Sequence, residues 1–309
     1  DITPQVARID SHLLNREGVT RLCYCGSVLH TRPRGLDSTR EPIQIGAEIY
    51  GHGGIESDLE IQRLLAASLA AIGLNNARLD IGHVGIFRSI CRQGEVNSEL
   101  EGELHEAMEA KDYASIQALA ASLGGVTRDA LLHLAGLYGG AEVIEVARAK
   151  LPRYPELVSA LDDLERLVRD NHFDVSVDLA DLRGYQYHSG VVFSAYAGKT
   201  SGVGANHHVG RNPLALGGRY DEVGKAFGRA RPATGFSLDL RDLSRVVSLG
   251  EQSSMIRASY GDQASLKDEI ARLRAAGHIV IQTLPDSDDG QQCNRELVFV
   301  DGKWSIKSL

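Results

Sequence analysis

Three short groups of side chains have the types needed for chemistry, but their spacing argues against each. Ala197–Thr200 (AGKT) ends like a phosphate-binding loop, yet a phenylalanine stands where that loop needs its first glycine. His207–His208 lacks a nearby carboxylate or cysteine that would complete a metal site. Arg229–Arg231 offers two arginines suited to phosphate, but a solvated face is the simpler expectation for such a pair. None of these groups predicts a catalytic centre, and we expect no metal.

A longer block, Gly217–Leu243 (GGRYDEVGKAFGRARPATGFSLDLRDL), is far more specific. It resembles motif 3 of the class II aminoacyl-tRNA synthetases, most closely the histidyl enzyme, which opens Gly-Gly-Arg-Tyr-Asp and continues Pro-Ala-x-Gly-Phe. The resemblance places Asp242 where that family has its ATP-binding arginine. A carboxylate at this position would repel the triphosphate that a guanidinium binds in a bidentate pair.

A second block, Leu182–Phe193 (LRGYQYHSGVVF), resembles the histidine-specific loop of the histidyl-tRNA synthetases. In that family an arginine contacts the carboxylate and phosphate region of the substrate, and two tyrosines line the imidazole pocket. The resemblance gives the first role to Arg183 and the second to Tyr187, with His188 in place of the second tyrosine.

A third block joins Asp1–Thr3 to Cys25–Gly51, and it resembles the segment after motif 1 together with motif 2. In the histidyl enzymes these segments bind the α-ammonium group and the ring of histidine, and the resemblance implies that Glu48 accepts the ring N–H. It adds four residues to the amino-acid side of the site: Asp1, Thr3, Gln44 and Glu48.

The ATP side of the same site looks dismantled. His30 replaces the motif 2 arginine that binds the α-phosphate, and Asp242 replaces the motif 3 arginine. The amino-acid side remains, because Asp1, Arg183 and Glu48 match the ammonium, carboxylate and ring N–H of free histidine one for one. Adenylate formation needs the phosphate charge neutralised in the transition state. We therefore expect histidine binding without activation, no enzymatic activity and no cofactor.

The composition limits the partners of the chain. It has 309 residues, 24% of them charged, and a formal net charge of −8. This balance opposes nucleic-acid binding, which usually needs a basic surface to neutralise phosphates. No apolar run reaches the ~18 residues that would span a membrane. We therefore expect a cytoplasmic protein with no nucleic-acid or membrane partner.

The cysteines show neither a CxxC pair nor zinc spacing. Cys23 and Cys25 alternate within RLCYCGSVL, which places both on one face of a predicted strand. We expect buried, reduced thiols at all four positions: Cys23, Cys25, Cys91 and Cys293.

The elements that must position these residues follow from hydrophobic periodicity. Short alternating runs in residues 1–55 predict antiparallel strands, and Ser57–Glu60 predicts the capped start of a helix. Strands are also predicted at 77–86, 174–182 and 190–197, and Pro155 suits the first turn of a helix that runs to residue 170. The predicted fold is α+β: an antiparallel class II synthetase-like core (1–88 and 172–247), a helical insertion (89–171) and a small C-terminal α/β unit (248–309).

Together the blocks cover roughly residues 1–245 in the right order. Asp1–Asp10 (DITPQVARID) and Gly228–Ser237 (GRARPATGFS) also resemble stretches typical of the regulatory subunits of ATP phosphoribosyltransferase. That resemblance implies a core sheet of six or seven strands and a motif 1 dimer element upstream of Asp1. It further implies a non-catalytic subunit that joins a short-form catalytic subunit in a hetero-octamer. Such a subunit activates the first step of histidine biosynthesis and confers feedback inhibition by L-histidine.

Two alternatives remain at the level of sequence. The chain also resembles a histidyl-tRNA synthetase or a related amino-acid-activating enzyme, which His30, Asp242 and the acidic charge oppose. A synthetase-like chain that serves another partner, such as a translation-control kinase, is the third reading. No kinase-like segment supports it.

Overall fold

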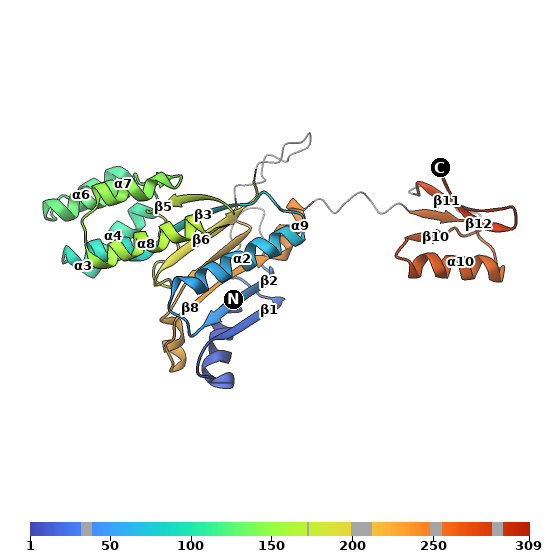
Figure 1. The fold of residues 1–309 in the computed structure, drawn as a ribbon, viewed down its shortest axis with the longest axis horizontal. Coiled ribbons are helices and arrows are strands. Elements are labelled where there is room, and N and C mark those ends of the chain that lie inside the picture. The colour runs from blue at the N-terminus through green and yellow to red at the C-terminus, as the bar shows by residue number, and fades with distance from the viewer. Residues whose placement is uncertain (32–38, 172, 199–211, 248–254, 286–292) are drawn as a thin grey trace. The chain divides into compact units, whose positions relative to one another are not determined.

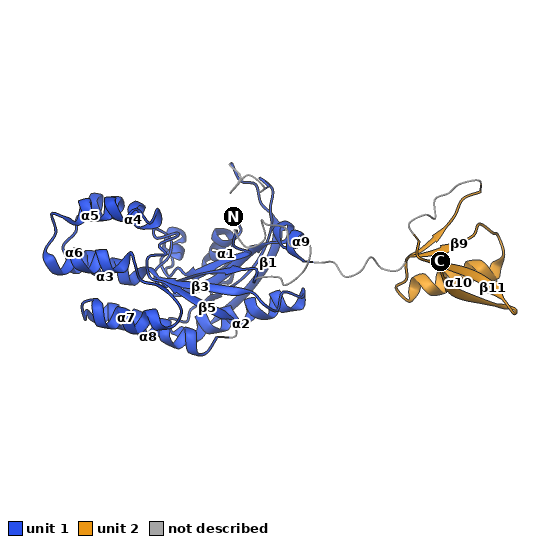
Figure 2. Ribbon diagram, turned by 90° about the horizontal axis from the view of Figure 1, so that it is seen from above, with its two compact units in different colours: residues 1–247 blue, residues 248–309 orange. Residues whose placement is uncertain are grey.

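The computed structural model describes residues 1–31, 39–171, 173–198, 212–247, 255–285 and 293–309. These residues divide into two compact units, Asp1–Val247 and Ser248–Leu309, each with its own core (Figures 1 and 2). Lys199–Thr200 and His207–His208 lie outside the described residues. No described helix combines the length and the apolar character that a membrane crossing requires.

An eight-stranded sheet forms the body of the first unit (Figure 1). Its order is β1-β2-β8-β7-β6-β3-β5-β4, and every pair is antiparallel except β3 and β5. It therefore has more strands than the six or seven expected, and it contains one parallel pair. The strands are β1 (Thr20–Ser27), β2 (Ile43–Tyr50), β3 (Arg78–His83), β4 (Tyr138–Gly139), β5 (Asp174–Asp178), β6 (Val191–Tyr196), β7 (Ala215–Arg219) and β8 (Ala233–Asp239).

Strand β2 shows why the sheet has two different faces. Its sequence IQIGAEIY alternates, so isoleucines and alanine point one way while Gln44, Glu48 and Tyr50 point the other way. Helix α2 (Ile55–Ala71) packs against β2 and β8 and joins the main hydrophobic core with the first set. The second set faces the N-terminal segment and a cavity. The helix that covers one face thus leaves the other face available for a ligand.

The N-terminal segment is helical, although the sequence pattern of residues 1–55 predicted only strands. It contains α1 (Thr3–Arg8) and a π-helix, η1 (Ile9–Leu14). Pro4 falls in the first turn of α1, where its missing N–H costs nothing. The buried guanidinium of Arg231 donates to both carboxylate oxygens of Asp10 at 3.0 and 3.1 Å and so ties η1 to the sheet. The expectation of a solvated face was therefore wrong for Arg231.

A helical region covers most of the segment between β3 and β5 (Figure 2). Asp112 caps one of its helices by accepting from the Ser115 N–H at 3.1 Å. Pro155 starts the last one, as predicted. The helices are α3 (Val84–Gln93), α4 (Ser98–Glu109), α5 (Tyr113–Ala120), α6 (Gly125–Leu134), α7 (Glu142–Lys150) and α8 (Pro155–Arg169).

Three predicted boundaries were wrong, and one of them is the end of β5, which lies at Asp178 and not at residue 182. Helix α2 begins after Gly54, and Ser57 lies inside its first turn with its hydroxyl donating to the Gly54 carbonyl at 2.8 Å. Strand β3 ends at His83, where the ring Nδ1 accepts from the Gly85 N–H at 3.1 Å and starts α3. At His83 a local side chain-to-backbone bond sets the boundary, which hydrophobic periodicity cannot reveal, whereas the N-cap Gly54 of α2 has no side-chain cap.

The thiols do not share one environment. Cys91 and Cys293 are buried as expected, but Cys23 and Cys25 are exposed. Both exposed residues lie on the face of β1 that points toward the side of α2, yet α2 packs over β2 and β8 and not over β1. The expectation of four buried thiols was therefore wrong for this edge strand.

The second unit is a small α/β structure. Its four-stranded sheet has the order β10-β9-β11-β12, in which β9 pairs in parallel with both β10 and β11. Asp301 and Gly302 have positive φ and form a two-residue hairpin turn between β11 and β12. Its elements are β9 (Ile256–Ala258), α10 (Ala264–Ala275), β10 (Val280–Gln282), β11 (Arg295–Val300) and β12 (Lys303–Ser308). The remaining elements of the first unit are η2 (Val223–Phe227) and α9 (Leu240–Val246).

Candidate functional site

Glu48 is the central charged group of the free sheet face. It is only 1% exposed and receives a hydrogen bond from the Tyr24 hydroxyl at 3.1 Å and another from the Tyr220 hydroxyl. Burial raises the pKa of Glu48 to about 7, although these hydroxyl donors favour its charged form. Within the described residues no Lys, Arg or His forms an ion pair with this carboxylate. A buried acid without a counter-ion is an unusual and costly feature.

Four tyrosines surround this carboxylate. The Tyr220 ring packs edge-on to Tyr50 and at 5.1 Å from Tyr187, and burial raises the pKa of each of these three phenols. Tyr24 completes the ring from the neighbouring strand. The hydroxyl of Tyr187 is buried and makes no hydrogen bond with the described residues. All four phenols therefore stay neutral around Glu48 over the physiological range.

The start of the chain closes one side of the site. The Gln44 amide accepts from the Ile2 N–H at 2.8 Å and donates to the Asp1 carboxylate at 2.6 Å. The Thr3 hydroxyl lies 2.9 Å from the hydroxyl of Tyr24. Gln44 thus holds the N-terminal segment in place with both ends of its amide, and this segment presents Asp1 and Thr3 to the cavity.

His188 forms the opposite wall. Its ring Nδ1 lies 3.2 Å from the carbonyl oxygen of Arg219, and burial lowers the pKa of the ring to about 4. The ring is therefore neutral at physiological pH. It stands between Gly184 and Gly218, at both of which a Cβ atom would come within 3.0 Å of it. Both glycines have positive φ (66° and 158°) as well, so this wall requires glycine twice.

Arg183 does not reach the cavity in this structure. Its guanidinium donates to both carboxylate oxygens of Asp181 at 2.8 and 2.5 Å, and to the hydroxyl of Tyr196 at 3.1 Å. The Asp181 partner raises the pKa of Arg183 further. The arginine that the sequence placed on a ligand carboxylate is thus paired with a carboxylate of the protein itself.

A cavity of about 210 Å³ lies between these walls. Five of the seven residues predicted to bind histidine line it, and Gln44 and Arg183 do not. Gly235 of β8 lies against its floor, where a Cβ atom would come within 1.5 Å of the Glu48 carboxylate. The five are Asp1, Thr3, Glu48, Tyr187 and His188.

A second, smaller cavity adjoins the first and shares Leu216 and Ser237 with it. His30 and Asp242, the two predicted replacements for ATP-binding arginines, both line this second cavity, together with Gln44. No Lys or Arg occurs among the described residues that line either cavity. Two carboxylates, Asp239 and Asp242, line the second cavity, and Arg245 pairs with Asp242 at 3.2 Å.

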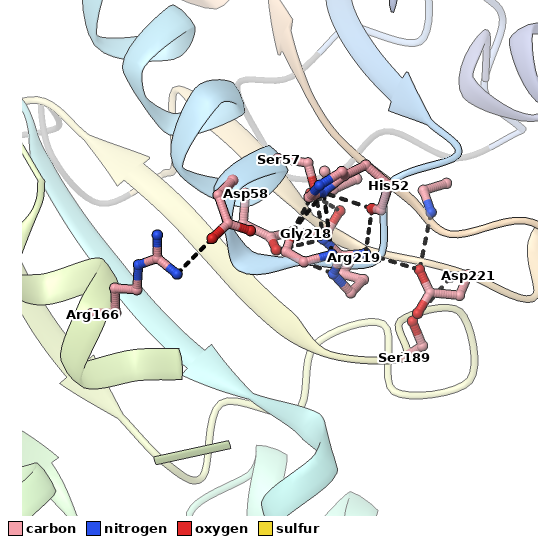
Figure 3. Close-up of polar contacts among 12 residues, drawn as sticks. His52, Ser57, Asp58, Arg166, Ser189, Gly218, Arg219 and Asp221 are labelled. Atoms are coloured by element: carbon pink, nitrogen blue, oxygen red, sulfur yellow. Dashed lines mark hydrogen bonds and ion pairs between the residues drawn. The ribbon is translucent and has the colours of Figure 1, made fainter. Parts of the chain in front are cut away.

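Arg219, at the end of β7, makes polar contacts with the start of α2 (Figure 3). Arg219 is 8% exposed. Its guanidinium donates to Asp58 at 2.6 Å, to the Ser57 hydroxyl at 2.8 Å and to the His52 carbonyl at 3.2 Å. Its own carbonyl accepts from Ser189 N–H at 2.8 Å as well as from the His188 ring. Arg219 therefore fixes both the end of β7 and the loop that carries His188.

Sequence reasoning missed three residues of this arrangement. Tyr24 and Tyr220 orient Glu48, and Arg219 fixes the loop of His188. Tyr220 and Arg219 belong to the GGRYD segment that was recognised as a motif, but no role followed from the motif alone. The alternation of β1 would have placed Tyr24 on the site face had it been read together with the register of β2.

Comparisons with known proteins place the two units separately. Residues 1–243 match the family described as histidyl-tRNA synthetase, and residues 253–307 match the ATP phosphoribosyltransferase subunit HisZ C-terminal domain. The chain is 51% identical to an ATP phosphoribosyltransferase regulatory subunit from Ralstonia pickettii over 311 residues, which cover 99% of this chain and 78% of that protein.

Two solved structures resemble most of this chain. One is an ATP phosphoribosyltransferase regulatory subunit/histidyl-tRNA synthetase from Bacillus halodurans, with a TM-score of 0.76, 26% identity and coverage of 94% of this chain and 75% of that one. The other is the ATP phosphoribosyl transferase (HisG:HisZ) complex from Thermotoga maritima, with a TM-score of 0.57, 19% identity and coverage of 78% and 80%. At that identity the second likeness concerns the fold alone.

Proposed function

This chain belongs to the family of ATP phosphoribosyltransferase regulatory subunits, and from that premise we propose that it is non-catalytic and binds L-histidine in the larger cavity of its synthetase-like unit. Histidine bound there acts as a feedback effector. In the cytoplasm the chain activates a short-form catalytic subunit, with which it forms a hetero-octamer. The synthetase scaffold is then a sensor of the pathway's end product.

The observation that carries this proposal is the set of polar groups at the cavity. Asp1 and Thr3 supply oxygen acceptors for an ammonium group, and Glu48 supplies an acceptor for a ring N–H. Both acids line the same cavity, whose volume of about 210 Å³ suits a single amino acid. Arg183 would bind the carboxylate of the ligand, and its present ion pair with Asp181 would then break.

The second cavity supports the absence of catalysis. Activation of histidine needs ATP beside it, with cations around the α-phosphate. The described residues at that place include His30, Asp239 and Asp242, and no Lys or Arg. Losing one charge-stabilising donor in such a site costs on the order of 3 kcal/mol of transition-state stabilisation. A chain lacking two of them should activate histidine at a negligible rate.

The partner is proposed from the family. The Thermotoga maritima structure is a complex of a HisG and a HisZ chain, and this chain resembles part of it. A regulatory subunit requires a subunit to regulate, and its effect on that subunit is a coupling free energy that must be reciprocal. Substrates of the catalytic subunit should therefore change the affinity for histidine by the same factor that histidine changes theirs.

Reconstitution with the catalytic subunit from the same organism tests this proposal. Formation of phosphoribosyl-ATP is followed with and without this protein, and histidine is then titrated into the mixture. We expect a large rate increase that histidine reverses. Glu48→Gln should remove the reversal and keep the activation, whereas Glu60→Gln, an exposed glutamate on α2, should change neither. Absence of both activation and complex formation would refute the regulatory role.

Amino-acid activation is the second candidate, because residues 1–243 match the synthetase family. Histidine-dependent exchange of pyrophosphate into ATP measures it directly. We expect no exchange above background at saturating histidine and ATP. Exchange at a rate comparable with a histidyl-tRNA synthetase would show that the chain is an enzyme.

A further inference from the structure

His188 offers the cavity an acceptor and no donor. Its Nδ1 faces the Arg219 carbonyl oxygen at 3.2 Å, and a carbonyl can only accept, so the proton of the neutral ring sits on Nδ1. The other ring nitrogen, Nε2, then carries a lone pair. Nε2 makes no hydrogen bond with the described residues, and His188 lines the cavity. A tyrosine at this position could have donated or accepted.

Glu48 offers a second acceptor in the same cavity, and one that lacks a counter-charge. It is buried at 1% exposure, and its described neighbours are the neutral hydroxyls of Tyr24, Tyr220 and Thr3. A neutral imidazole has one N–H and one lone pair, so it satisfies only one of two acceptors and leaves the buried carboxylate uncompensated. An imidazolium has two N–H groups and a positive charge. It can therefore donate to both acceptors and also balance the negative charge of the Glu48 carboxylate.

We propose that the site takes histidine as its imidazolium form, with one ring N–H donated to Glu48 and the other to Nε2 of His188. This inference rests on the proposed function, because it assumes that histidine is the ligand of this cavity. His188 is then the residue that determines which protonation state of the ligand binds. Above neutral pH, where free histidine has a neutral ring, binding must take up a proton.

The groups that face the two acceptors support this arrangement. Around Glu48 lie Tyr24, Tyr50, Tyr187 and Tyr220, whose pKa values burial raises, so they remain neutral. Asp1 at the cavity edge takes the ammonium group of the ligand and leaves the ring to Glu48.

Around His188, burial lowers the ring pKa to about 4, and the nearby Asp181 opposes that shift without overcoming it. Arg88 of α3 donates to the His188 carbonyl at 3.2 Å and fixes the backbone, while Arg219 supplies the carbonyl that holds Nδ1. Protonating His188 itself would therefore require strongly acidic conditions. At pH 8 the proton can be taken up by the ligand ring or by Glu48, whose pKa burial raises to about 7.

Calorimetry on the whole protein tests the inference. Histidine is titrated at pH 8 in two buffers of different ionisation enthalpy, and the difference in heat gives the number of protons exchanged. We expect uptake of close to one proton, and a dissociation constant that rises about tenfold per pH unit above pH 8. Toward pH 5 the affinity should also fall, because protonated Glu48 must release its proton. Binding without proton uptake at pH 8 would overturn the inference.

Two variants and one analogue separate the roles. His188→Tyr supplies a hydroxyl that can donate to a neutral ring, so proton uptake should disappear while binding at pH 8.5 is retained. Glu60→Gln, which changes an exposed glutamate outside the cavity, should leave proton uptake unchanged. With the natural protein, 2-fluorohistidine, whose ring is far less basic, should bind at least tenfold more weakly than histidine at pH 7, and His188→Tyr should narrow that gap. Equal affinity for both ligands would contradict the inference.

Failure of the proposed function looks different. If histidine produces no heat and no shift in thermal stability at any pH between 5 and 9, the cavity does not bind histidine. Both the function and the inference are then wrong. If histidine binds without taking up a proton, the function stands and the imidazolium assignment fails.

Discussion

At the scale of single residues, Glu48 makes the stability of the unliganded protein depend on pH. Its pKa is about 7 in the folded protein and about 4.5 when exposed. The folded state therefore binds more protons between these values. The stabilisation from the neutral carboxyl is fully present below pH 4.5 and is lost as the pH rises through 7. The difference corresponds to roughly 3 kcal/mol at high pH.

Glu48→Gln should therefore stabilise the unliganded protein in a pH-dependent way. We expect its free energy of unfolding to be close to that of the natural protein at pH 5 and greater by up to about 3 kcal/mol at pH 9. Urea denaturation at both pH values measures this. The matched change Glu60→Gln on the surface should show no such gain, and an equal gain in both variants would exclude Glu48 as the cause.

A second prediction for a single residue concerns Arg183, which pairs with Asp181 in this structure. If it leaves Asp181 for the carboxylate of histidine, Arg183→Met should weaken histidine binding about 10- to 100-fold, as expected for a charge-assisted hydrogen bond. Histidinol lacks that carboxylate, so its affinity should be the same for both proteins. Calorimetry with the two ligands measures the difference. A parallel loss for histidinol would mean that the variant disturbs the site in general.

The sequence predicted individual cavity residues only where they belong to a recognisable motif. The five cavity residues Asp1, Thr3, Glu48, Tyr187 and His188 come from segments far apart in the chain and lie around one cavity. Motif matching gave their identity but could not show which groups already have a partner. Arg183 forms an ion pair with Asp181, two residues away in the chain. The sequence alone does not show that this carboxylate competes with a ligand for the arginine.

At the scale of elements, Arg219 connects the end of β7 to the start of α2. The pair with Asp58 is buried on both sides, and burial raises the pKa of Asp58 against the opposing effect of the arginine. Arg219→Gln should lower the free energy of unfolding by about 3–5 kcal/mol, because it leaves a buried carboxylate without a partner. Chemical denaturation measures the loss.

The exposed pair of Arg21 and Glu60 provides the matched control. Its side chains are 59% and 45% exposed, and Arg21→Gln should cost less than about 1 kcal/mol. Adding Asp58→Asn to Arg219→Gln should recover part of the larger loss, because the stranded charge is removed. Strictly additive losses would argue against a direct pair.

Elements were predictable where hydrophobic periodicity was strong, as in β1, β2, β6 and α8. The N-terminal helices α1 and η1 were not, because six-residue segments carry too little periodicity to separate helix from strand. Their conformation depends on tertiary partners, above all the Arg231 guanidinium on Asp10, which lies 221 positions away along the chain. No local pattern encodes such a contact.

At the scale of the whole molecule, the two units have separate cores. Among the described residues, the smaller core contains seven buried side chains, one of which is Leu273 at 2% exposure. Leu273→Ala should cost about 2–5 kcal/mol, which is enough to unfold a unit of this size. Histidine affinity should be unchanged, since every residue of the cavity belongs to the first unit.

Limited proteolysis together with calorimetry checks this prediction. Cleavage of the variant should be confined to residues 248–309 while histidine binding persists. Leu69→Ala, which opens a cavity in the larger core, should instead weaken histidine binding and broaden the cleavage pattern. Loss of histidine affinity in Leu273→Ala would show that the two units are coupled.

The pairing of β2 with β8 has a consequence for synthesis on the ribosome. Gln44 pairs with Asp239, so two neighbouring strands of the sheet are about 195 residues apart in the chain. At 5–20 residues per second, β2 waits roughly 10–40 s for β8 to be translated. During that interval β2, already paired with β1, has an unpaired hydrogen-bonding edge, and Glu48 lacks the hydrogen bond from Tyr220. The cavity around Glu48 is thus among the last parts of the first unit to form.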